Sequence, residues 1–146
     1  METREKKKAS RKAAVTLIIF LLFTISFAAA NAAAPISSQK INNTEDAAEF
    51  LLSQGWETDS SQAQVQNTTL PMEFDAVYTE YNQLQKSQGC DLTKFAGKEI
   101  IIFTLPILNY PNTDTDVYAT ILTHNGLIIG GDIHSAELNG FMHTLK

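Results

Sequence analysis

The chain of 146 residues has a single cysteine, Cys90, and no arginine after Arg11. One cysteine cannot form an intramolecular disulfide, so the stability of the protein must come from its core. Beyond residue 34 the sequence carries only five lysines against 14 acidic residues, a net charge of −9 with histidine neutral. Binding to nucleic acid or to anionic lipid needs clustered basic side chains, so neither is expected as a partner of this part.

Recognised catalytic motifs are also missing from the sequence. No G-x-S-x-G nucleophile elbow occurs, and no histidine adjoins Cys90 to act as its base. Gly130-Gly131 ends an apolar run instead of opening a helix, which favours a bulge or close backbone packing over a phosphate-binding loop. The sequence therefore predicts no cofactor, and it predicts that Cys90 is a buried packing residue.

The N-terminal segment has the order of a secretory signal. Six of the 11 Lys and Arg residues precede Ala13, and the stretch from there to Ala34 is apolar and uncharged. Basic residues before an apolar segment stay in the cytoplasm, so the remainder is expected to be extracytoplasmic. The strongly apolar part, residues 13–27, is shorter than the roughly 20 residues of a bilayer span. This favours secretion after cleavage near Ala30–Ala32, with retention of residues 13–34 as a membrane anchor as the alternative.

Three segments are predicted along the chain. Residues 1–34 form the signal peptide or anchor, residues 35–43 are a polar tether, and residues 44–146 form one domain. In that domain, a first helix is expected to begin near residue 43, where Asn43 or Thr44 can cap it. A second helix is expected between Phe74 and Gly89, where apolar residues recur at intervals of three and four.

The rest of the domain has the pattern of β-strands, predicted at residues 64–70, 99–105, 116–123 and 127–133. The first is rich in Gln, Asn and Thr, which indicates an exposed edge. Asn125-Gly126, between the last two, is typical of a type I′ hairpin turn. These elements predict an α+β fold, in which an antiparallel meander of about four strands carries two main helices on one face and follows an N-terminal signal or anchor helix.

Several short motifs of the domain are shared with a known family. They are Tyr78, Tyr81-Asn82, Leu84-Gln85-Lys86, Gln88-Gly89, Asn109-Tyr110-Pro111, Gly130-Gly131-Asp132 and Asn139-Gly140-Phe141. With these motifs, residues 43–145 resemble the bacterial family called domain of unknown function 4830. The resemblance implies an exported or membrane-attached protein of a Gram-positive type of bacterium, and it implies no reaction.

One cluster of side chains is capable of binding a metal: Asp132, His134, Glu137 and His143. Residues two apart in a strand point to the same face, so Asp132 and His134 are expected side by side. With Glu137 or His143 they would be able to hold zinc or manganese. Their spacing matches no recognised ligand motif. The sequence favours the alternative, in which no metal binds, Asp132 caps the following turn and His134 lies on the surface.

Four aromatic residues are the candidate binding side chains: Tyr110, Trp56, Tyr78 and Tyr81. Aromatic faces stack on peptides and glycans, and tyrosine hydroxyls add hydrogen bonds. Three of the four also fit as ordinary core residues. Tyr110 is the least explained by packing, because it lies in the predicted turn Asn109-Tyr110-Pro111.

Two functions fit this sequence. The first is a non-catalytic module of the bacterial cell envelope that binds a protein, peptide or glycan through its sheet face or helix–sheet cleft. The second is an extracytoplasmic hydrolase, with or without a metal, that uses Asp132 and His134. No catalytic triad or ligand motif accompanies these two residues, so the sequence favours the binding module. In both cases contact with the membrane is confined to the N-terminal segment.

Cells that express the chain with a C-terminal tag should carry the tagged domain outside the cytoplasm, because the basic and apolar parts of residues 1–34 direct export. Cell fractionation measures this, and the intact mass of the exported protein separates cleavage near Ala30–Ala32 from retention. A control chain that lacks residues 1–34 should stay in the cytosol. Recovery of the full-length tagged chain among cytosolic proteins would contradict the prediction.

Overall fold

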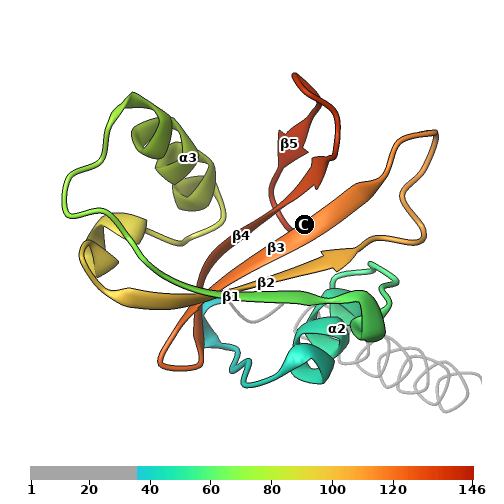
Figure 1. The fold of residues 1–146 in the computed structure, drawn as a ribbon, viewed down its shortest axis with the longest axis horizontal. Coiled ribbons are helices and arrows are strands. Elements are labelled where there is room, and N and C mark those ends of the chain that lie inside the picture. Colours follow the sequence, from blue (N-terminus) through green and yellow to red (C-terminus); the bar gives the residue numbers. More distant parts are fainter. Residues whose placement is uncertain (1–35) are drawn as a thin grey trace, which may run out of the picture. The chain divides into compact units, whose positions relative to one another are not determined.

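The computed structural model describes residues 36–146, and the predicted signal or anchor segment lies outside these residues (Figure 1). The elements in chain order are η1 (Ile36–Ser38), α2 (Thr44–Ser53), η2 (Ser60–Gln62), β1 (Gln64–Thr69), α3 (Ala76–Ser87), η3 (Leu92–Phe95), β2 (Glu99–Pro106), β3 (Val117–His124), β4 (Leu127–Ser135) and β5 (Met142–His143). The strands form one antiparallel sheet in the order β1-β2-β3-β4-β5. The predicted α+β class is confirmed. Within the described range, neither α-helix is long and apolar enough to cross a bilayer.

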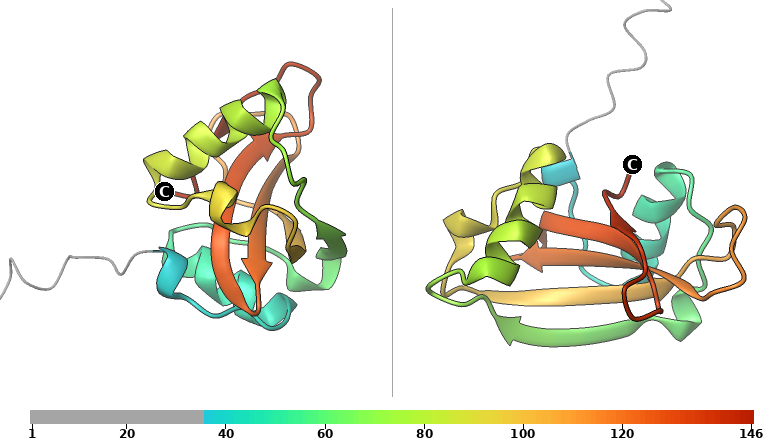
Figure 2. Two further views of the ribbon diagram at one scale, coloured as in Figure 1. Left: turned by 90° about the vertical axis from the view of Figure 1, so that its left-hand side faces the viewer. Right: turned by 90° about the horizontal axis from the view of Figure 1, so that it is seen from above.

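The two α-helices pack on opposite faces of the sheet (Figures 1 and 2). Phe50 and Leu51 of α2 belong to the core cluster that contains Phe103 of β2, whereas Tyr81 of α3 packs on the cluster that contains Ile100 of the same strand. The prediction that both helices share one face was therefore wrong. The reason lies in β2, which has buried side chains on both faces of the sheet. A strand of this kind needs other elements to cover it on each face.

Short-range interactions fix the helix starts where the sequence predicts them. The side chain of Asn43 accepts a hydrogen bond from the backbone N–H of Asp46 at 2.7 Å, and Asp75 accepts one from Tyr78 N–H at 2.8 Å. Each bond satisfies a backbone donor that has no partner within the helix. Helix α2 begins directly after its cap, as expected.

The predicted tether contributes to the domain. Ile36 and Ile41 are buried in the cluster beneath α2. The N–H of Ile41 donates to the carbonyl of Gly126 at 2.8 Å, and the N–H of Ile128 donates to the carbonyl of Gln39 at 3.2 Å. Residues 36–41 therefore cover the start of the outer edge of β4. The prediction of a tether was based on the polar composition of residues 35–43 as a whole, and it did not consider the two isoleucines separately.

The sheet edges and the hairpin follow the local sequence closely. Strand β1 lies at one edge of the sheet, as its polar composition predicts. Between β3 and β4, Asn125 and Gly126 have φ values of 51° and 77°, and two positive values in succession are typical of a type I′ turn. A register shift between Leu122 and Thr123 forms the bulge expected near Gly130-Gly131.

Replacing Gly126 with valine should lower the free energy of unfolding by about 2 kcal/mol, because a β-branched residue resists positive φ. A Cβ atom there would also lie 3.0 Å from Oδ1 of Asn42. Asn125→Gly is the matched control, since glycine accepts the φ of 51°, and it should change stability by less than about 1 kcal/mol. Urea denaturation measures both. Equal stability of the two variants would contradict the prediction.

Candidate functional site

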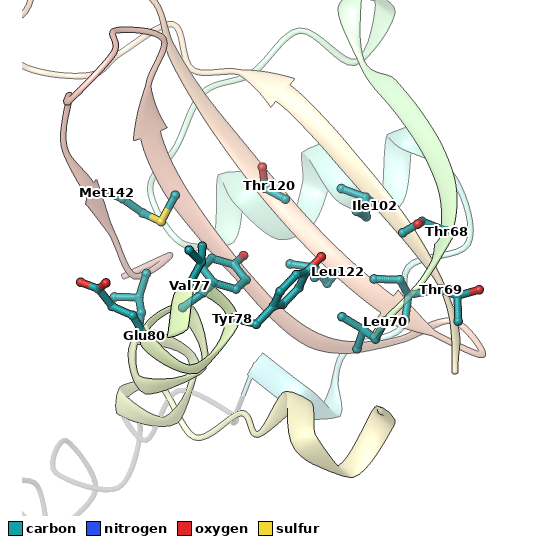
Figure 3. A pocket seen from close by; sticks show the side chains of 13 residues that line it. Thr68, Thr69, Leu70, Val77, Tyr78, Glu80, Ile102, Thr120, Leu122 and Met142 are labelled. Carbon is teal, nitrogen blue, oxygen red and sulfur yellow. The ribbon is translucent and has the colours of Figure 1, made fainter. Parts of the chain in front are cut away.

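An apolar groove with a volume of about 600 Å³ opens between α3 and the sheet, on the face opposite α2 (Figure 3). Ile100, Ile102 and Leu122 line its floor from β2 and β3. The walls are formed by α3 on one side and by the end of β1 on the other. The groove is thus an uncovered part of the sheet face that α3 borders.

The apolar side of α3 borders this groove and is only partly buried. Val77 and Tyr78 line the groove and are 73% and 39% exposed. The buried residues of the helix are instead polar, Asn82 and Gln85. The three-and-four spacing located the apolar side correctly, but it did not show that the sheet leaves part of that side open. The only signal was the presence of glutamines where a packed helix usually carries apolar residues.

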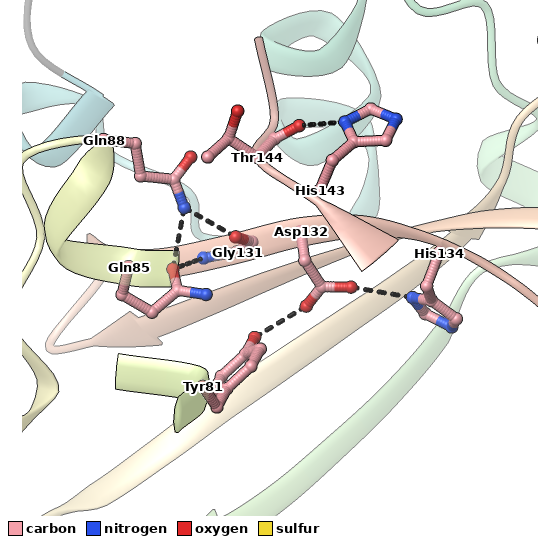
Figure 4. A network of polar contacts seen from close by, with 8 residues as sticks. All are labelled: Tyr81, Gln85, Gln88, Gly131, Asp132, His134, His143 and Thr144. Carbon is pink, nitrogen blue, oxygen red and sulfur yellow. Dashed lines mark hydrogen bonds and ion pairs between the residues drawn. The ribbon is translucent and has the colours of Figure 1, made fainter. Parts of the chain in front are cut away.

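Two glutamines fix the C-terminal half of α3 to the outer edge of β4 (Figure 4). Oε1 of Gln85 accepts hydrogen bonds from Gly131 N–H at 2.8 Å and from Nε2 of Gln88 at 2.7 Å. Nε2 of Gln88 also donates to the Gly131 carbonyl at 2.6 Å, and its Oε1 accepts from Leu145 N–H at 3.2 Å. These side chains pair with backbone groups that a neighbouring strand would otherwise satisfy. The sequence reasoning missed both residues.

The glycine pair is required by this close approach. A Cβ on Gly130 would lie 2.8 Å from Oε1 of Gln85, and one on Gly131 would lie 2.5 Å from the backbone oxygen of Thr120. Real Cβ atoms do not approach so closely, so a side chain at either position would push α3 or β3 away. The expectation of close backbone packing at Gly130-Gly131 is confirmed.

A chain of hydrogen bonds links α3 to β4 beside the groove (Figure 4). The Tyr81 hydroxyl donates to Oδ2 of Asp132 at 2.6 Å, and Nδ1 of His134 lies 2.7 Å from Oδ1 of the same carboxylate. Asp132 is only 2% exposed. Burial, followed by the charge of Asp132, raises the pKa of Tyr81 well above its ordinary value, so the hydroxyl stays protonated as a donor. Asp132 is thus a buried partner of two side chains, and its predicted role as a turn cap was wrong.

The position of His134 is set from two directions. Since the Asp132 carboxylate accepts, Nδ1 of His134 carries the proton of this bond, and in the neutral form of the ring Nε2 presents a lone pair. Tyr118 stacks on the ring with centroids 6.0 Å apart. The prediction that Asp132 and His134 point to the same face is confirmed. Among residues 36–146, Asp132 is the only hydrogen-bond partner of the His134 ring, so no Ser, Thr or Cys side chain is bonded to Nε2 as a hydrolytic nucleophile.

The four residues considered as metal ligands are not gathered at one point. His143 lies opposite Ile133 in the sheet, where Tyr110 contacts its Nε2 at 3.0 Å and its Nδ1 contacts the Thr144 carbonyl at 2.7 Å. In the described part of the chain, no group of three His, Cys, Asp or Glu residues is arranged to hold a metal ion. The alternative metal set of Asp132, His134, Glu137 and His143 is therefore not assembled.

The four aromatic candidates are divided between the two faces. Tyr78 and Tyr81 line the groove, whereas Trp56 and Tyr110 lie in the other cluster. There the Tyr110 ring stacks with Trp56 at 5.6 Å and with Phe141 at 4.8 Å between centroids. Nε1 of Trp56 donates to the Leu145 carbonyl at 2.8 Å. Packing therefore accounts for Tyr110, and this aromatic stack holds the C-terminus against the sheet.

Cys90 is buried, and burial raises the pKa of its thiol. A thiol that resists ionisation is a poor nucleophile. The prediction that Cys90 is a packing residue is confirmed.

The molecule is a small α+β domain with a five-stranded antiparallel sheet, closed on one face and grooved on the other. The chain belongs to the family DUF4830, a domain of unknown function, whose sequence model matches residues 50–133. That match confirms the family resemblance and includes α3, the groove floor and Asp132. No curated protein and no solved structure matches the chain.

Replacing Tyr81 with phenylalanine should lower the free energy of unfolding by about 1–3 kcal/mol, because it leaves a buried oxygen of Asp132 without its donor. Tyr78→Phe removes a hydroxyl from a half-exposed ring of the same helix and should stay within about 0.5 kcal/mol of the wild type. Urea denaturation of the two variants side by side measures the difference. The role assigned to the Tyr81–Asp132 bond would be wrong if both variants unfolded at the wild-type midpoint.

Proposed function

We propose that this domain is an exported, non-catalytic binding module of the cell envelope, and that its groove binds an apolar peptide segment flanked by basic residues. The observation that carries the proposal is the apolar surface left open between α3 and the sheet. Val77 and Met142 line the groove and are 73% and 51% exposed. A volume of about 600 Å³ lies within the range of about 300–1,000 Å³ typical of ligand sites.

The chemistry of the walls favours a peptide over a lipid chain. Thr68 and Thr69 of the edge strand β1 line the groove, and an edge strand has backbone groups that no neighbouring strand satisfies. Hydroxyls and backbone groups bind a peptide, which has its own donors and acceptors, and they bind an acyl chain poorly. An anionic membrane surface is repelled by the net charge of −9 beyond residue 34.

The same charge selects a basic partner. The domain carries 14 acidic residues against five lysines, and Glu80 of α3 lies in the groove wall. Complementary charge speeds the encounter with a basic segment and disfavours acidic ones. The proposed ligand therefore has apolar side chains for the floor and Lys or Arg beside them.

The hydrolase alternative lacks support of the same kind. The buried Asp132 beside Nδ1 of His134 matches the base half of a catalytic triad. A hydrolase of this type also needs a nucleophile within hydrogen-bond reach of the histidine, and the described residues supply none. The Asp132–His134 pair is thus better explained as part of a binding surface.

The test uses a fluorescently labelled twelve-residue peptide of alternating leucine and alanine with two lysines at one end. Fluorescence anisotropy measures its affinity for the protein purified from the cells that express the full chain. Val77→Lys should weaken binding at least about fivefold, because it replaces apolar contact with charge repulsion. Leu52→Lys is the matched control, since Leu52 is a 62% exposed leucine of α2 on the other face. It should change the affinity by less than about twofold.

Three outcomes would contradict the proposal. They are an absence of saturable peptide binding, equal weakening of binding by the two lysine variants, and displacement of the peptide by uncharged phosphatidylcholine vesicles that bind to the domain. The last outcome would identify a lipid as the occupant of the groove.

A further inference from the structure

His134 lies on the same face of the sheet as the groove. Met142 lines the groove and is the cross-strand partner of His134, so the two side chains leave the sheet on the same face. Glu80 of α3 also lines the groove (Figure 3). The opposite wall is formed by Thr68 and Thr69 of β1 and by Leu70, which follows that strand. The groove thus has one carboxylate in its lining and an imidazole next to Met142 on the same sheet face.

The imidazole is held in a single arrangement. Asp132 fixes Nδ1 at 2.7 Å, Tyr81 fixes Asp132 at 2.6 Å, and Tyr118 stacks on the ring. Both carboxylate oxygens of Asp132 are occupied by these contacts. Nε2 of His134 has no hydrogen-bond partner anywhere in residues 36–146, and the side chain is 28% exposed. A buried network that leaves one atom open to solvent, beside a groove, is a preorganised contact point for a ligand.

We infer that His134 and Glu80 together bind the basic side chain at one end of the peptide segment. This inference rests on the proposed function and adds the residues that set its specificity. With its proton on Nδ1, the neutral imidazole offers an acceptor at Nε2, and Glu80 offers a second acceptor with negative charge. A lysine ammonium has three donors and a guanidinium has five, so either can satisfy both acceptors at once. A carboxylate at this position would face two acceptors and no donor.

The experiment compares three labelled peptides with the same apolar part. At one end they carry lysine, acetyl-lysine or glutamate, so that the apolar contacts stay equal while the donor and the charge change. The wild-type protein should bind the lysine peptide about tenfold more tightly than the acetyl-lysine peptide, and the glutamate peptide most weakly. Anisotropy titrations give the dissociation constants.

His134→Ala should bring the lysine and acetyl-lysine peptides to within about threefold of each other. It should leave the affinity for acetyl-lysine nearly unchanged, because the floor of the groove is intact. His134→Gln, whose amide oxygen is again an acceptor, should restore part of the preference. His124→Ala is the control, since His124 contacts the Glu99 carbonyl at the hairpin end of β3. It should retain the full preference, and urea midpoints identify any variant that fails to fold.

The results separate the two proposals. Failure of all three peptides to bind would overturn the proposed function and this inference with it. Binding of all three without preference, or a lysine preference that survives His134→Ala in a folded protein, would overturn the inference alone. Preference for the glutamate peptide would also overturn it, because His134 would then act as a donor.

Discussion

The contact between α3 and the backbone of β4 is the interaction on which the grooved face depends. Gln85 is fully buried, and its Oε1 accepts from Gly131 N–H where an outer strand would normally pair. Its Nε2 finds no partner among the described residues, a state that costs about 1–3 kcal/mol when an amide is buried. The helix is therefore attached by a few directional bonds as well as by apolar area. The close approach of the helix needs Gly130, because a Cβ there would lie 2.8 Å from Oε1 of Gln85.

This mode of attachment explains why the groove exists. The glutamines hold the C-terminal half of α3, so its N-terminal half, with Val77 and Tyr78, borders the sheet without covering it. Tyr81 lies between the two halves, one turn before Gln85. Its hydroxyl reaches Asp132 across the sheet face, and this bond extends the polar contact from the edge of β4 to His134. The geometry of the groove and the orientation of the histidine thus share one cause.

Local features of the fold were predictable from the sequence, and long-range ones were not. The cap at Asn43 and the turn at Asn125-Gly126 depend on φ angles and on hydrogen bonds within a few residues, which the sequence encodes directly. The choice of sheet face for each helix depends on contacts between distant residues. The near-continuous apolar run of β2 carried the missing information, because it indicates burial on both sides.

The site shows the same division. The pairing of Asp132 with His134 followed from their spacing of two in a strand, whereas the burial of Asp132 requires Tyr81, 51 residues away along the chain. His143 failed as a ligand for a related reason. It follows Met142 in β5, and consecutive strand residues point to opposite faces, so His143 joins Trp56 and Tyr110 instead of His134. Residues that lie close together in the sequence thus make contacts on opposite faces of the sheet.

The two faces differ in how far the sheet itself is covered. On the α2 face, packed aromatic rings and the fully buried Leu145 cover the sheet. No part of the sheet floor is left open there by this cluster. On the α3 face, Val77 and Met142 are exposed beside the uncovered sheet floor, at a cost in solubility that the surrounding negative charge reduces. Polar replacements at Val77 would remove that cost without disturbing the buried glutamines. The presence of apolar surface at a position where folding does not require it supports the proposal that the groove binds a ligand.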